Sequence, residues 1–142
     1  MQLRLRKLHP DAIIPQYQHD GDAGMDLHAI EAMAIAPHTT ALIKTGLAAE
    51  IPTSTELQVR PRSGLALKHS ITVLNSPGTI DANYRGEIGV ILINHGVETF
   101  HVTPGMRVAQ MVMAQVIRAE IKEVSELSET IRSTGGFGST GR

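Results

Sequence analysis

The residues of this chain best suited to chemistry lie within one turn-rich stretch, residues 75–86. Its pair Pro77-Gly78 predicts a tight turn in which Gly78 can take a positive φ. Backbone N–H and C=O groups would then come close to any flat molecule that enters the turn. A lone acid, Asp81, follows the branched apolar residue Ile80. An aspartate in such a loop is most often a solvated turn residue, but loops of this kind also carry function, so both interpretations stay open.

A second set of residues is suited to binding an anion with several oxygens. Arg62, Ser63 and Gly64 combine a guanidinium fork, a hydroxyl and a glycine that permits close approach. The rest of the set is Gln110, Arg132, Ser139 and Thr140. The seven histidines lack the spacing of metal ligands or of a catalytic triad, and no Walker-type loop is present. With Asp81, these residues suit phosphoryl chemistry by positioning and charge neutralisation.

Short apolar runs separated by Gly and Pro predict the strands that must position these residues. The runs are residues 3–5, 25–29, 33–35, 41–43, 47–51, 57–59, 71–74, 88–93, 100–102 and 107–117. The stretch 75–86 is then the tip of a hairpin between the runs 71–74 and 88–93. Residues 65–68 predict a single helical turn whose free N–H groups would face the same anion as Arg62.

Composition limits the class of protein. The chain has 142 residues, 13 Gly, 7 Pro and many short apolar runs, which favour one all-β domain. The absence of Cys and a net charge of -1 indicate a reducing cytoplasm and argue against a nucleic-acid partner. No apolar run approaches the ~20 residues of a membrane span, and the cationic N-terminus lacks the apolar core of a signal peptide. We therefore expect a cytoplasmic protein without a membrane partner.

Five ordered motifs give the chain its resemblance to a known family. Residues 75–86 resemble the third motif of the homotrimeric dUTP pyrophosphatase (dUTPase) family. The other four motifs match residues 22–27, 61–66, 107–112 and 135–141. One such match would carry little weight, because glycine-rich octets occur by chance. Five in order form a specific signal.

The resemblance implies hydrolysis of dUTP to dUMP and pyrophosphate by attack of water on the α-phosphate. In the family, this reaction keeps uracil out of DNA and supplies dUMP for thymidylate synthesis. Asp81 is the expected general base. The expected uracil contacts are Asn75 and the backbone of Thr79, Ile80 and Gly89, in a tip too tight for dTTP or dCTP. Tyr84 is expected to lie against the deoxyribose and to exclude a 2′-hydroxyl.

The same resemblance assigns the phosphate contacts and the cofactor. Arg62, Ser63, Gly64 and Gln110 are expected at the α- and β-phosphates. Arg132 and residues of the C-terminal motif complete the site: Arg132, Ser139 and Thr140 at the γ-phosphate, and Phe137, followed by Gly138, over the uracil. Mg²⁺ is expected on the three phosphates and on water rather than on direct protein ligands. Asp26 would order the water around it.

The implied fold is a jelly-roll-like β-barrel in residues 1–132, followed by a flexible glycine-rich arm, residues 133–142, that closes over the active site. The implied assembly is a homotrimer with three active sites at subunit interfaces. Residues 121–131 are a point of conflict, because their apolar spacing favours a helix. The family has an extended segment there that crosses onto a neighbour. We adopt the extended prediction because Ser125, Ser128 and Thr130 weaken a helix.

The sequence departs from the common family pattern at Asn83, where an acid is frequent, and at Met106, usually Asp. Ser133 replaces a usual Gly and is expected to stiffen the arm. Two alternatives belong beside the hydrolase. The related dCTP deaminase family has a Glu about where Ile91 stands, and an apolar residue there cannot shuttle protons. A non-catalytic nucleotide-sensing homologue would be favoured by loss of Asp81 or of the arm, and both are present.

Overall fold

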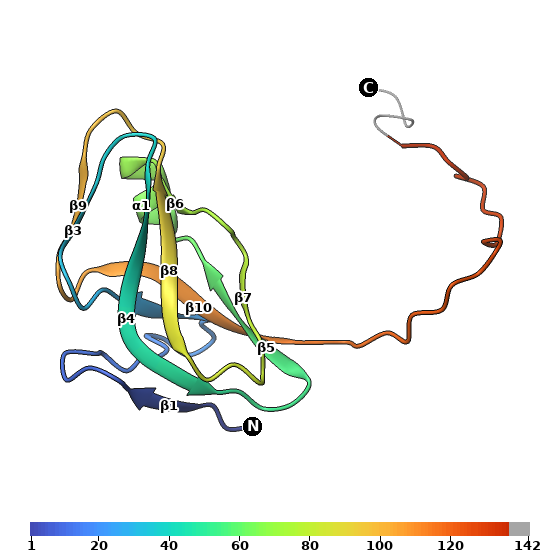
Figure 1. Cartoon of the computed structure of the whole chain (residues 1–142), viewed down its shortest axis with the longest axis horizontal. Coiled ribbons are helices and arrows are strands. Elements are labelled where there is room, and N and C mark those ends of the chain that lie inside the picture. The colour runs from blue at the N-terminus through green and yellow to red at the C-terminus, as the bar shows by residue number, and fades with distance from the viewer. Residues whose placement is uncertain (137–142) are drawn as a thin grey trace.

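Two four-stranded antiparallel sheets pack face to face in the computed structural model, which describes residues 1–136 (Figure 1). The first sheet has the order β1(Arg4–Lys7), β4(Thr40–Glu50), β8(Glu87–Asn94), β6(Ile71–Val73). The second has the order β2(Gly24–His28), β10(Arg107–Gln115), β5(Thr55–Arg60), β7(Gly78–Ile80). A small sheet pairs β3(Met33–Ile35) with β9(Phe100–Val102). The predicted all-β, jelly-roll-like fold is confirmed.

Strict alternation along the strands creates one core between the sheets. In β8 every second residue is buried, so that Ile88, Val90 and Leu92 face inward. Leu57 and Val59 of β5 do the same from the opposite sheet, and all five belong to one apolar cluster. Because side chains alternate between the two faces of a strand, the intervening residues of β5 and β8 face outward. Those outward faces carry part of the candidate site.

Strand β4 corrects the prediction of two separate strands at residues 41–43 and 47–51. The two runs form one strand with a register shift between Lys44 and Ala48. Within this bulge Gly46 has a φ of 67°. Thr45, which reads as polar in sequence, is fully buried and donates its hydroxyl to the Ile88 carbonyl at 2.6 Å. The bulge thus allows the strand to continue past the polar residue Thr45.

The hairpin prediction is right for its strands and incomplete for its tip. Strands β6 and β8 pair as predicted, with Val73 opposite Leu92. Within the tip, however, Gly78–Ile80 forms β7, which pairs with β5 in the other sheet. Gly78 is buried in that strand and is absent from the glycines of positive φ, so the turn proposed for it is wrong. The backbone conformation of Gly78 is set by its pairing with Val59 at the edge of the sheet, and not by local turn propensity.

The predicted helical turn is longer than expected. Helix α1(Ser63–His69) begins two residues before residue 65, and its C-cap residue, Ser70, has a φ of 56°. Ser63 and Gly64 are weak helix formers, so the sequence pattern missed them. Lys68 and His69 occupy the last turn, where positive charge suits the helix dipole.

The chain leaves the body after β10, and residues 116–136 run outward in a wide arc (Figure 1). Ile121 is 95% exposed and Leu127 is 87% exposed. No helix forms in this segment as far as residue 136, which confirms the extended prediction against the periodicity. An isolated amphipathic helix without a packing surface has little stability. The boundary between residues 132 and 133 stays a prediction.

Within residues 1–136, α1 is too short to cross a membrane, and no other helix meets the length and apolarity of a span.

Candidate active site

Asp81 stands directly after β7, with its side chain exposed to solvent. The turn that follows is tied to it, because the Tyr84 amide donates to the Asp81 carbonyl at 3.0 Å. The Arg85 guanidinium folds back and donates to the carbonyls of Ala82 and Tyr84 at 2.7 and 2.8 Å. The acid therefore sits between a paired strand and a turn held by three hydrogen bonds.

Two adjoining hollows lie beside this acid, with volumes of about 200 and 280 Å³. We call them together the hairpin hollow. Both are lined by Thr79, Ile80, Tyr84, Glu87 and Gly89. The smaller adds Asp81 and Ile88, and the larger adds Leu42, Lys44, Val59, Asn75, Gly78 and Ile91. The structure thus brings the predicted base Asp81 together with five residues predicted to contact the nucleoside: Asn75, Thr79, Ile80, Tyr84 and Gly89.

Glycines keep the hairpin hollow open. A Cβ atom at position 89 would lie 2.7 Å from the Leu42 Cδ1 atom, closer than real Cβ contacts allow. Gly86 leaves room for the Tyr84 ring, whose hydroxyl donates to the Glu87 carbonyl at 3.1 Å. A side chain at position 86 would collide with that ring. Tyr84 is therefore held in one orientation at the wall of the hollow.

A second group of predicted residues gathers around Asp26, which is largely buried. The Arg62 Nε donates to its Oδ1 at 2.9 Å, and an Arg107 Nη donates to its Oδ2 at 3.4 Å. Arg62 also donates to the Arg107 carbonyl at 3.4 Å. We call these three residues the arginine cluster. It joins β2, β10 and the start of α1, and it presents guanidinium groups that a phosphate can share.

Gln110 and the start of α1 lie next to the arginine cluster. Gln110 is opposite Asp26 in the pairing of β10 with β2. Its Nε2 donates to the Pro61 carbonyl at 2.9 Å, which brings it beside the segment that leads to Ser63 and Gly64. Nothing lies within 4 Å of a Cβ built on Gly64, so the approach to its backbone is open. Four predicted phosphate contacts, Arg62, Ser63, Gly64 and Gln110, are thus neighbours.

His28 adds a titratable group to this side of the molecule. Its Nδ1 is buried without a hydrogen-bond partner. Burial lowers the pKa of His28 below its ordinary value, Asp26 opposes that shift, and Arg107 and Arg62 reinforce it. This residue could not be identified from the sequence, because a lone histidine on a strand has no diagnostic spacing.

The hairpin hollow, as formed by residues 1–136 of a single chain, includes none of the four neighbouring phosphate residues. Arg132 lies on the exposed terminal segment, where its Nε donates to the Gly135 carbonyl at 2.9 Å. Ser133, beside it, has a φ of 44°, a conformation that favours glycine. The predicted contacts Phe137, Gly138, Ser139 and Thr140 lie outside the described residues.

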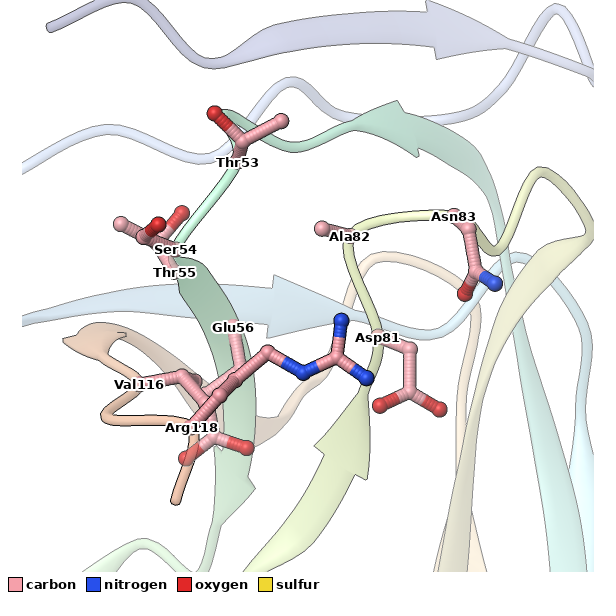
Figure 2. Close-up of a pocket in the computed structure, with 9 residues that line it drawn as sticks. All are labelled: Thr53, Ser54, Thr55, Glu56, Asp81, Ala82, Asn83, Val116 and Arg118. Atoms are coloured by element: carbon pink, nitrogen blue, oxygen red, sulfur yellow. The ribbon is translucent and has the colours of Figure 1, made fainter. Parts of the chain in front are cut away.

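Asp81 also borders a third hollow of about 550 Å³ (Figure 2). The Arg118 side chain, from the segment after β10, extends into it on the side of Asp81, and Glu56 of β5 lies on its wall. Sequence reasoning missed Arg118, Glu56 and Glu87. Arg118 stands beyond the fourth motif, and an outward-facing Glu on a strand carries no pattern of its own.

A family model described as dUTPase matches residues 10–141. The chain belongs to the dUTPase family. It is 74% identical to a deoxyuridine 5'-triphosphate nucleotidohydrolase of Picosynechococcus sp. over 99% of both chains. It is 60% identical to a protein of the same name from Clostridioides difficile, covering 98% of this chain and 97% of that protein.

Solved structures of other dUTPases share the fold. Staphylococcus bacteriophage 80alpha dUTPase with dUPNHPP has a TM-score of 0.93 at 27% identity, over 99% of both chains. A mutant dUTPase from phage phi11 of S. aureus, described with a coordinated structural Mg(II) ion, has a TM-score of 0.82 at 27% identity. That match covers 89% of this chain and 98% of the phage protein.

Proposed function

We propose that this chain hydrolyses dUTP to dUMP and pyrophosphate. The observation that carries the proposal is the hairpin hollow, which has Asp81 at its rim and Asn75 and strand backbone along its walls. Membership of the dUTPase family and 74% identity to a deoxyuridine 5'-triphosphate nucleotidohydrolase support it. This reaction would keep uracil out of DNA and supply dUMP for thymidylate synthesis.

Asp81 acts as the general base in this proposal. Its carboxylate takes a proton from a water molecule, the water oxygen forms a bond to the α-phosphorus, and the bond from that phosphorus to the bridging oxygen of the β-phosphate breaks. Pyrophosphate leaves with the electron pair of that bond. The exposed carboxylate on a fixed turn supports the assignment, since a base must reach water without changing its own position.

The uracil is recognised by groups of fixed position. Asn75 and the backbone of Thr79, Ile80 and Gly89 provide donors and acceptors that suit the edge of uracil, and a 4-amino group would reverse one of them. Ile91, on the wall of the hollow, stands where a deaminase would need an acid. Tyr84 covers the side of the deoxyribose and leaves no space for a 2′-hydroxyl.

The phosphates are held by Arg62, Ser63, Gly64 and Gln110, supplied by another copy of the chain. Two observations support a homotrimer with sites at subunit interfaces. None of these phosphate residues lines the hairpin hollow of the same chain. Apolar residues of the terminal segment have no partner within it: Ile117, Ile121, Leu127 and Ile131 are all at least 87% exposed. Sedimentation as a trimer without nucleotide is the expected result, and an active monomer would refute shared sites.

The remaining contacts come from Arg132 and from the C-terminal arm, residues 133–142, that follows it. Arg132, Ser139 and Thr140 hold the γ-phosphate, and Phe137 with Gly138 covers the uracil when the arm closes. Closure excludes water and holds the α-phosphorus in line with the attacking water. The exposed path of residues 117–136 supports an arm long enough to reach a neighbouring subunit.

Mg²⁺ is the proposed cofactor, bound by the triphosphate and by water. Both carboxylate oxygens of Asp26 are engaged by Arg62 and Arg107, which fits a role for Asp26 in ordering water rather than binding the ion. Among residues 1–136 no three His, Cys, Asp or Glu gather as a metal site would need. When bound, the ion neutralises charge on the phosphates. Loss of turnover on removal of divalent ions is the expected result.

One assay tests the proposed reaction. Pyrophosphate release is measured with Mg²⁺ from dUTP, dTTP, dCTP and UTP in parallel, and only dUTP is expected to be turned over efficiently. Ammonia release from dCTP would establish the deaminase alternative. Tight dUTP binding without pyrophosphate release would establish a nucleotide-sensing protein. The cytoplasmic location stays a prediction of the sequence.

A further inference from the structure

At the bulge in β4 the backbone pairing with β8 is interrupted, and side chains supply hydrogen bonds in its place. Lys44 lies opposite Gly89 and Ala48 opposite Glu87, so three residues of β4 face the single residue Ile88. Unpaired backbone groups inside a sheet destabilise it unless another partner is found. Here the Thr45 hydroxyl bonds to Ile88, and the Gly46 amide donates to the Glu87 carboxylate at 2.9 Å.

Glu87 therefore fixes the start of β8 against the bulge. Gly46 itself cannot move easily, because a Cβ at this position would lie 3.0 Å from the Cβ atoms of both His9 and Ala12. Its carbonyl also accepts a hydrogen bond from the Leu8 amide at 2.7 Å. The carboxylate of Glu87 is thus anchored to a rigid part of the fold.

The backbone carbonyl of Glu87 holds Tyr84. The Tyr84 hydroxyl donates to the Glu87 carbonyl at 3.1 Å, and Gly86 leaves space for the ring between them. Glu87 lines both parts of the hairpin hollow together with Tyr84 and Gly89. One residue consequently links the wall of the hollow to the bulge of β4.

We propose that Glu87 is a positioning residue for sugar selectivity. Its carboxylate pins the first residue of β8 to Gly46, and the carbonyl of the same residue holds the Tyr84 hydroxyl, so the tyrosine ring stays at a fixed distance from the sugar. The inference rests on the proposed function, since it assumes that Tyr84 excludes a 2′-hydroxyl. Without the anchor, the strand start and the ring can both shift, and space opens for ribose.

The test compares kcat/KM for dUTP and for UTP in the full-length protein. Glu87→Ala removes the acceptor for the Gly46 amide, and we expect the dUTP to UTP ratio to fall about 10-fold, the size of one lost charge-assisted hydrogen bond. Glu87→Gln keeps an acceptor oxygen of similar reach and should restore most of the ratio. Glu50→Ala, an exposed glutamate on β4 that pairs with Arg4, is the matched control and should leave the ratio unchanged.

Tyr84→Phe provides a second route that leaves the core untouched. It removes only the hydroxyl, and it should lower the ratio by a similar factor. In the double variant with Glu87→Ala the ratio should fall no further, because both changes break the same linkage.

The possible failures are distinct. A wild-type protein that does not hydrolyse dUTP would overturn the proposed function. A wild-type protein that does, with an unchanged ratio in Glu87→Ala or in Tyr84→Phe, would overturn the role of Glu87. If Glu87→Ala does not fold, the ratio in Tyr84→Phe decides. Additive losses in the double variant would also contradict the linkage.

Discussion

The hairpin hollow and the arginine cluster are built by different means. The hollow is lined largely by strand residues at the junction of β7 and β8, and none of the ion pairs within residues 1–136 lies in it. The arginine cluster is held by two ion pairs to one largely buried carboxylate. Backbone groups in paired strands have fixed positions, which suits discrimination between flat bases that differ by one group. Guanidinium groups suit a flexible polyphosphate chain.

Because the two regions are built differently, substitutions should affect them in different ways. Under the proposed function the hollow selects its nucleoside by shape, so the critical positions there are glycines and the groups that orient Tyr84. In the cluster, function depends on charge and on bidentate geometry, so even a change that conserves charge should be costly.

Asp81→Asn is expected to have the largest effect, because it removes the reacting group and leaves the shape of the hollow intact. Turnover of dUTP should fall by about 10²- to 10⁴-fold, the usual contribution of a positioned base. Nucleotide affinity should change little, because the amide has nearly the same size. Single-turnover kinetics and dUMP titration measure the two quantities, and near-normal kcat would show that another group activates the water.

Arg62→Lys tests the cluster with charge conserved. A lysine cannot reproduce the guanidinium fork that meets Asp26 and leaves further N–H groups for phosphate. We expect kcat/KM for dUTP to fall about 10- to 100-fold, the range of a lost charge-assisted hydrogen bond. Affinity for dUMP should fall much less, since it lacks the β- and γ-phosphates. Equal losses for both nucleotides would place Arg62 at the nucleoside instead.

Gly89→Ala tests shape in the hollow. The new Cβ would meet the Cδ1 end of Leu42, a 56% exposed side chain that must shift within the wall of the hollow. The cost should lie at the low end of overpacking, about 1 kcal/mol, so the KM for dUTP should rise roughly 5-fold. The matched variant Gly89→Ala with Leu42→Ala relieves the contact and should recover part of the loss. Failure of the second change to help would mean that the methyl group obstructs the nucleotide directly.

The sequence predicted most of the strands, because the alternation of apolar and polar residues is a local property. The grouping of the site residues came from the resemblance to the dUTPase family. It missed β7, since the pairing of Gly78 with Val59 joins segments that are distant in the chain. It divided β4 in two for a related reason. Thr45 reads as polar, and only its hydrogen bond to Ile88 across the sheet makes it a buried strand residue.

Side-chain roles that depend on tertiary contacts were also beyond the sequence. Glu87 has no motif of its own, and its importance appears only when Gly46 and Tyr84 are seen at its two ends. The helical spacing of residues 121–131 misleads for the opposite reason, because periodicity predicts a helix where the chain has no surface to pack against. The assignments at Phe137 to Thr140 rest on resemblance alone.

His28, beside the arginine cluster, should make folding stability depend on pH. This is the smallest of the expected effects. Burial lowers its pKa in the folded chain below the ordinary value of 6.5. As the pH falls below about 6.5, the unfolded chain takes up a proton at this position while folded His28 stays neutral. The unfolded state therefore binds more protons, and folding stability declines with falling pH until the folded pKa is passed.

His28→Gln should remove this contribution. Its Tm should follow that of the wild type above pH 7, and below about pH 6.5 it should decline less steeply, with a difference of only a few degrees. His101→Gln, at an exposed position of β9, is the matched control and should keep the wild-type slope. Thermal unfolding between pH 5 and 8 at constant ionic strength measures all three proteins. Parallel curves for the wild type and His28→Gln would show that the acid sensitivity arises elsewhere. His28, next to the arginine cluster, would then not be the group that lowers folding stability at acid pH.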